Sequence, residues 1–208
     1  MAERKSSEER REQIIGATLR LVARKGFASV TLRDVAAEVG IVHGLIRHYF
    51  ASRDELVAAA FDHAVTAELA SDEAMLAGLD PVAALAAWFA TTPEDHYLVW
   101  IDAWSEAPRN AALAAAVARH HRDCERILAD VIRRAVAAGA ASSLDVDADS
   151  RMLTALADGM AVQHHAMGIV DARAADEVVF GSVEARLAIA PGTLAAADRA
   201  PARGQWLG

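Results

Sequence analysis

The chain has a single cysteine, Cys124, among its 208 residues. One thiol excludes an internal disulfide and any zinc site built from several cysteines, and it is typical of a reducing compartment. The opening residues, MAERKSSEERREQ, lack the apolar run of a secretory signal, and no uncharged stretch is long enough to span a membrane. We therefore expect a cytoplasmic protein that does not associate with a membrane.

Aromatic residues and strand-like patterns are also scarce. Aromatic side chains make up 5% of the chain, whereas hydrophobic residues, many of them alanine, make up 54%. Segments such as AALAAAVAR and VTAELASDEAMLAGL favour helix over strand. No repeat of fixed period and no glycine-rich phosphate loop is present. The predicted fold is all-α, with enough apolar material for one large or two small domains.

The net charge of -8 is distributed unevenly along the chain. Residues 1–53 hold ten Lys or Arg against six acidic residues, a net charge of +4. Residues 54–208 hold eleven Arg against 23 acidic residues, a net charge of -12. A basic segment in an acidic protein indicates a surface that meets a polyanion, although a solvated basic helix would show the same excess.

The first fifty residues contain three helical patterns. Apolar residues at helical spacing fill residues 14–22, and a Lys-Gly pair then ends the helix. Thr31 opens a capping box, Thr-Leu-Arg-Asp, and a short helix follows it to Gly40. A third helix ends at Phe50, so only a tight glycine turn separates the last two. Such a pair makes a helix-turn-helix, whose second helix lies in the DNA major groove.

The third helix is expected to present a DNA-binding face. If Ile41, Ile46 and Phe50 pack inward, its other side chains point outward. Arg47 can donate two hydrogen bonds to guanine or bind a phosphate, and Gly44 lets the helix backbone come close. The predicted DNA-binding residues are Thr31, Arg33, Val42, His43, Gly44, Arg47, His48, Tyr49 and Arg53.

Two of these positions, Tyr49 and Arg53, can each be interpreted in two ways. Tyr49 could place its hydroxyl on a phosphate or cap the small core of this region. Arg53 lies in a second capping box, Ser-Arg-Asp-Glu, and a helix N-terminus beside an Arg can bind phosphate. An ordinary helix cap with an exposed Arg would give the same pattern.

The run TLRDVAAEVGIVHGLIRHYFASRDEL resembles the DNA-binding domain of the tetracycline-repressor family. Matching positions are Thr31, Val35, Ala36, Gly40, Ile41, Gly44, Ile46, Tyr49, Phe50, Arg53 and Leu56. The family usually has a Ser, which caps the recognition helix and contacts phosphate, where this chain has Val42. Where this chain has Arg47, the family frequently has a Tyr, and the change to Arg shifts a contact toward guanine. The His-Tyr-Phe ending is similar to the branch that includes the choline-sensing repressors of betaine synthesis.

The resemblance implies a ligand-responsive homodimeric repressor with two partners, a double-stranded DNA operator of pseudo-palindromic sequence and a small-molecule inducer. It implies a DNA-binding domain over residues 1–52 and a helical ligand-binding and dimerisation domain over residues 53–190. Family members dimerise through their last two long helices, here near residues 147–167 and 173–188. Residues 191–208, rich in Ala, Gly and Pro, are predicted to form a flexible tail.

Glycine and proline positions divide the second domain into helices. The predicted spans are 53–76, 82–90, 94–106, 109–138, 147–167 and 173–188. Gly159 and several alanines let another helix approach the fifth of these closely, and its apolar residues occupy much of its circumference. Such a helix needs partners on two sides, and a second copy of the chain would supply one of them.

Aromatic side chains gather between residues 88 and 104. With Asp102 and Glu106 nearby they would make a pocket for an organic cation, although the same rings would also fill a core between helices. The predicted ligand-binding residues are Trp88, Tyr97, Trp100, Trp104, His121, Asp158 and His164.

Histidine and cysteine residues on the later helices leave other functions open. His120, Cys124 and His164 would suit a zinc site or a helical enzyme. No metalloprotease signature or acid-base constellation accompanies them, so we expect no metal, no cofactor and no catalytic residue. A ligand-binding bundle without DNA binding is a further alternative, and Val42 is its one indication.

Overall fold

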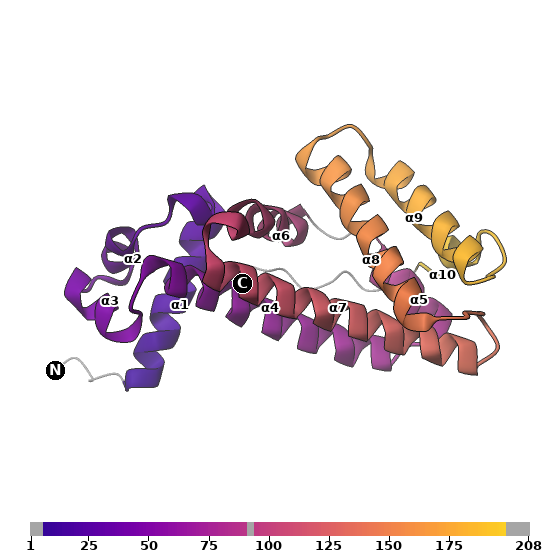
Figure 1. Cartoon of the computed structure of the whole chain (residues 1–208), viewed down its shortest axis with the longest axis horizontal. Helices are drawn as coiled ribbons and strands as arrows, with labels where there is room; N and C mark the ends of the chain where they lie inside the picture. Colours follow the sequence, from indigo (N-terminus) through magenta and orange to yellow (C-terminus); the bar gives the residue numbers. More distant parts are fainter. Residues whose placement is uncertain (1–5, 91–93, 199–208) are drawn as a thin grey trace. The chain divides into compact units, whose positions relative to one another are not determined.

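The computed structural model describes residues 6–90 and 94–198, which form helices and turns without a strand, so the all-α prediction is confirmed (Figure 1). The helices are α1 (Ser7–Lys25), α2 (Leu32–Val39), α3 (His43–Tyr49), α4 (Arg53–Ala77), α5 (Pro81–Phe89), α6 (Glu94–Glu106), α7 (Ala111–Ala137), α8 (Val146–Ala161), α9 (Ala172–Arg186) and α10 (Thr193–Ala197). Short 3-10 turns cover Phe27–Ser29 and Ala107–Arg109, and a π-helical turn covers Val162–Ala166. In this part of the chain, no helix has the length and apolar character needed to cross a bilayer.

The described residues pack as two compact units. The first unit contains residues 6–67 and 99–120, and the second contains residues 68–98 and 121–198. Each unit therefore includes part of α4, α6 and α7. The division differs from the predicted domain boundary after residue 52, because the beginning of α4 and the end of α6 pack with the helix-turn-helix.

The first unit is built around large buried side chains of α1, α3 and α4. Ile14, Phe27 and Ile46 are each 0% exposed, and Phe50 is 1% exposed. The ring of Phe61 on α4 lies edge-on to that of Phe27, with 6.0 Å between centroids. Of the predicted inward positions, Ile46 and Phe50 are confirmed, whereas Ile41 is half-buried. Ile46 and Phe50 determine which face of α3 points outward.

The second unit contains α5, α8, α9 and α10. Helices α8 and α9 pack against each other, and α10 packs against both α5 and α9 (Figure 1). Leu153 of α8, Val183 of α9 and Leu194 of α10 are each 0% exposed. These three side chains are part of the buried core of the second unit.

The end of the described chain differs from the predicted flexible tail. Residues 193–197 form α10, and the carboxylate of Glu184 accepts hydrogen bonds from the backbone amides of Gly192 and Leu194, both at 2.8 Å. The tail prediction is therefore wrong for residues 191–198, because a buried leucine and a carboxylate from α9 outweigh the Ala- and Gly-rich composition. Residues 199–208 lie outside the described residues.

Candidate nucleic-acid interface and ligand pocket

Helix α2 is capped as its sequence predicts. The hydroxyl of Thr31 accepts from the backbone amide of Asp34 at 3.2 Å, and the Asp34 carboxylate accepts from the Thr31 amide at 2.9 Å. Lys25 donates to the same carboxylate at 2.5 Å, and this hydrogen bond is the largest reason that the pKa of Asp34 falls to about 2. Gly40 ends α2 in the left-handed conformation, with φ 74°.

Basic residues of α1 pair with α2. Arg24 donates to Glu38 at 2.7 Å and Arg20 does so at 3.3 Å, and the hydrogen bond from Arg24 is the largest cause that holds the pKa of Glu38 below its usual value. Arg33 and Arg47, by contrast, make no hydrogen bond or ion pair with any described residue. Arg33 of α2 and Arg47 of α3 are therefore cationic groups that an external partner can bind.

Helix α3 turns small and polar side chains outward. The exposed residues are Val42, Gly44, Arg47 and His48, while His43 and Tyr49 are half-buried. A Cβ added to Gly44 would meet nothing within 4 Å, so a partner can approach the backbone there. The ring of Tyr49 stands edge-on to that of His48, with 5.2 Å between centroids. The structure thus gathers five of the predicted DNA-binding residues on one short helix.

Arg53 is held within its own unit. Its Nε donates to the Val30 carbonyl at 3.1 Å, and its Nη2 donates to the Phe27 carbonyl. Its Nη1 donates to Glu106 at 2.9 Å and to Asp54 at 3.0 Å. A phosphate contact through this guanidinium would have to replace these bonds. The geometry favours a positioning role, in which Arg53 joins the start of α4 to the turn between α1 and α2.

Two acidic residues at the end of α6 form hydrogen bonds with the turn between α1 and α2 and with Arg53. The Asp102 carboxylate accepts from the backbone amide of Phe27 at 2.6 Å, and Glu106 is 6% exposed beside Arg53. The hydrogen bond from Arg53 is the largest cause that holds the pKa of Glu106 below its usual range. A Cβ on Gly26 would lie 3.1 Å from Asp102, and its φ of 77° also favours glycine. The sequence predicted both carboxylates beside a cation pocket, whereas the structure places Asp102 against the turn between α1 and α2 and Glu106 against the start of α4.

The tryptophans of α6 also belong to the first unit. Trp100 is 5% exposed, and its ring lies edge-on to Phe61 with 5.1 Å between centroids. Trp104 is half-buried beside Trp100 at 5.8 Å. Trp100 is therefore part of a core, as the alternative interpretation of the aromatic cluster expects.

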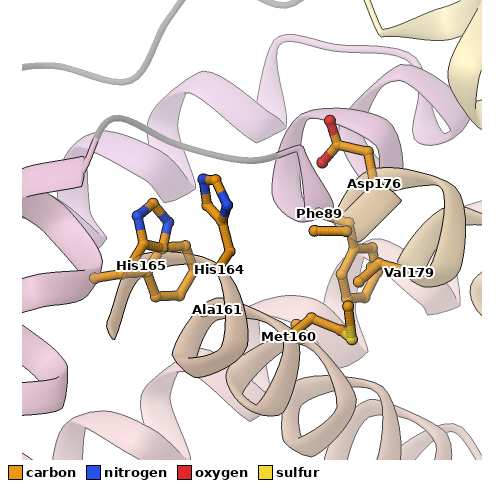
Figure 2. A pocket seen from close by; sticks show the side chains of 10 residues that line it. Phe89, Met160, Ala161, His164, His165, Asp176 and Val179 are labelled. Carbon is orange, nitrogen blue, oxygen red and sulfur yellow. The ribbon is translucent and has the colours of Figure 1, made fainter. Parts of the chain in front are cut away.

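In the second unit, a small cavity lies among α5, α8, α9 and the part of α6 before residue 99 (Figure 2). Its volume is about 20 Å³, which is room for a single water molecule. Its lining consists of Phe89, Tyr97, Ala157, Met160, Ala161, His164, His165, Ala175, Asp176 and Val179. Of the predicted ligand residues, Tyr97 and His164 line it. His165 and Asp176 were not predicted; the adjacent His pair was a signal for the former, and nothing in the sequence marked the latter.

The π-helical turn carries both histidines of this cavity. The Nδ1–H of His164 donates to the Val170 carbonyl at 2.8 Å. The ring of His165 stacks on Tyr97, with 5.1 Å between centroids and 25° between planes. A π-turn inserts an extra residue into a helix and is frequent at functional sites. Both imidazole rings line the cavity, and Figure 2 shows His164 between His165 and Asp176.

The remaining predicted ligand residues lie elsewhere in the second unit. His121 Nδ1 is 3.8 Å from the Asp158 carboxylate, so these two are brought together outside the cavity lining. Trp88 is half-buried on α5. Among residues 6–90 and 94–198, no group of three or more His, Cys, Asp or Glu side chains is arranged to hold a metal ion. His120 of the zinc alternative instead hydrogen-bonds Asp62 at 2.7 Å.

Comparison with known proteins connects both parts of the chain to DNA-binding regulators. Residues 14–60 match the bacterial regulatory proteins of the tetR family, and residues 82–188 match the C-terminal domain of BetI-type transcriptional repressors. The chain is 30% identical to the HTH-type transcriptional regulator BetI of Burkholderia ambifaria in an alignment 192 residues long, which covers 86% of this chain and 94% of that protein. Over 51 residues, 24% of this chain and 25% of the relative, it is 43% identical to the HTH-type transcriptional regulator PksA of Bacillus subtilis.

Solved structures agree on the fold. A TetR transcription regulator from Haloarcula marismortui superposes with a TM-score of 0.75 at 21% identity and covers 86% of this chain and 99% of its own. A protein from Saccharomonospora viridis, described as a transcriptional regulator and solved with choline, has a TM-score of 0.75 at 23% identity, covering 87% and 98%. The relatives are regulators rather than enzymes, which sets the helical-enzyme alternative aside. The chain therefore belongs to the tetR family of bacterial transcriptional regulators, whose members bind DNA operators and dimerise, and its C-terminal part is of the BetI type.

Proposed function

We propose that the chain is a homodimeric repressor that binds a pseudo-palindromic operator through α3 and is released from it by a small organic cation. The observation that carries this proposal is the outward face of α3. Arg47 is exposed there without an intramolecular partner in the described residues, while Ile46 and Phe50 anchor the opposite face. A guanidinium so held can reach guanine edges or a phosphate in the major groove.

The outer face of α8 and α9 supports the dimer. Met152 of α8 and Val178 of α9 are each 46% exposed although both are apolar. A Cβ on Gly159 or Gly181 would meet nothing within 4 Å, so a second pair of helices can approach there. Burying this face in a two-fold dimer would pair two copies of α3, one for each half-site of the operator.

The cavity of the second unit supports an organic cation as inducer. Phe89 and Tyr97 supply aromatic rings and Asp176 supplies a carboxylate, a combination that attracts a quaternary ammonium group. The BetI-type domain and the choline-bound relative favour choline itself. A cavity of about 20 Å³ does not admit choline as it stands, so binding requires lining side chains, such as the stacked Tyr97 and His165, to move. An inducer that prefers the opened form would shift the population away from the DNA-binding form.

DNA binding is tested with Arg47→Ala and a duplex that carries the intergenic region beside the protein's own gene. We expect nanomolar wild-type binding that weakens steeply with salt, and an affinity at least tenfold lower for Arg47→Ala. Circular dichroism and the oligomeric state should not change. Arg122→Ala, which removes an exposed Arg of α7, is the matched control and should bind as the wild type does. Equal binding by all three proteins, or no binding by the wild type, contradicts the proposal.

A further inference from the structure

Val42 is an exposed apolar residue at the start of α3. Its side chain is 74% exposed, and the other exposed large apolar side chains of the described residues lie beyond residue 67. It occupies the N-cap position, with φ -72° and ψ 138°, where a side-chain oxygen normally accepts a backbone amide. Valine has no such oxygen. Val42 therefore stabilises neither the N-terminal end of α3 nor the core of the first unit.

The exposed residues that follow Val42 in α3 are polar or small. Arg47 and His48 are exposed, and Gly44 leaves open space beside them. These residues do not form the contiguous apolar patch of a protein-binding surface. They suit a major groove, where phosphates and base edges accept hydrogen bonds. The apolar group that a major groove offers is the 5-methyl group of thymine.

We infer that Val42 is a specificity-determining residue that packs its methyl groups against the 5-methyl group of one thymine in each operator half-site. The inference rests on the proposed function, because it requires α3 to lie in the major groove. A serine at the same position would cap α3 and gain nothing from the thymine methyl group. The exchange of a cap for an apolar contact thus adds a base preference at one position of the operator.

The test uses a duplex that the full-length wild-type protein selects from a library of randomised sequences. Each thymine of the selected half-site is then replaced by deoxyuridine, which removes the methyl group and keeps every hydrogen-bonding group of the base. Dissociation constants are measured by fluorescence anisotropy for the wild type, Val42→Ala and Val42→Ser. Leu144→Ala, which shortens an exposed apolar side chain between α7 and α8, is the matched control.

We expect one thymine in each half-site to be sensitive in the wild type. Its replacement should raise the dissociation constant about fourfold per half-site, the effect of one buried methyl group. The same replacement should not affect Val42→Ala or Val42→Ser, whereas Leu144→Ala should respond as the wild type does. Val42→Ser should also have a higher melting temperature, because its hydroxyl caps α3, so its lost methyl response cannot come from unfolding.

Two results separate the inference from the proposed function. If no deoxyuridine substitution weakens wild-type binding, or if one weakens the wild type and Val42→Ala equally, the inference is overturned while DNA binding stands. If the wild type selects no duplex at all, the proposed function is overturned and the inference with it.

Discussion

Replacing Glu106 by Gln tests how the end of α6 supports the DNA-binding helices. The carboxylate accepts from Arg53 at 2.9 Å and from Arg109 at 3.2 Å, and only 8% of its side chain is exposed. The Gln side chain keeps the volume and one acceptor oxygen but removes the charge beside the guanidinium. A hydrogen bond to a charged partner contributes about 1.5–3 kcal/mol, and the Arg53 side chain is 25% exposed, so we expect the free energy of unfolding to fall by about 2 kcal/mol.

Urea denaturation followed by circular dichroism at pH 7 measures this change. Glu73→Gln is the matched control, because its carboxylate pairs with Arg126 at 2.9 Å on a surface where each side chain is about half exposed. An exposed pair of this kind contributes about 0–1 kcal/mol. Equal losses in the two variants, or no loss in Glu106→Gln, would refute the view that the buried ion pair holds the turn between α1 and α2.

The pH dependence of the same difference follows from the pKa of Glu106. Because the folded-state pKa lies below the ordinary value of 4.5, the unfolded chain binds more protons than the folded chain between these two values. The stabilisation is therefore complete above pH 4.5 and is lost as the pH falls through the folded pKa. The difference in the free energy of unfolding between the wild type and Glu106→Gln should therefore decrease as the pH falls through this acidic range. A difference that stays constant over this range contradicts the view that the ion pair with Arg53 lowers the pKa of Glu106.

Two further variants test the second unit. Tyr97→Ala removes the ring stacked on His165 and should weaken choline binding about three- to thirtyfold in calorimetry. Leu98→Ala, which shortens an exposed neighbouring side chain, should bind choline as the wild type does. Equal affinities of the two variants would place the ligand elsewhere. Leu194→Ala should lower the free energy of unfolding by about 2–5 kcal/mol, because this side chain is 0% exposed; an unchanged urea midpoint would mean that α10 is not packed in solution.

Local rules predicted much of the first unit from the sequence. The cap at Thr31 and the left-handed turn at Gly40 depend on groups within a few residues of each other, so their spacing alone indicates them. The apolar spacing likewise identified Ile46 and Phe50 as the buried anchors of α3. From these elements the outward face of the recognition helix, and with it the regulatory function, was predictable.

Other features depend on residues far apart in the chain. The partners of Arg53 include Phe27 and Glu106, which are 26 and 53 positions away, so no local pattern distinguishes this positioning role from a phosphate contact. Composition also misjudged residues 191–198, because their order comes from the backbone bonds to Glu184.

The sequence by itself determined helices α1 to α9, the helix-turn-helix and the face that α3 presents, since each follows from contacts within one or two turns. Only the tertiary structure decided that Asp102 and Glu106 support the DNA-binding helices, and that Tyr97, His164 and Asp176 surround one cavity. The physical reason is that these groupings arise from packing between different helices, and the spacing of residues along the chain does not encode which helices will meet.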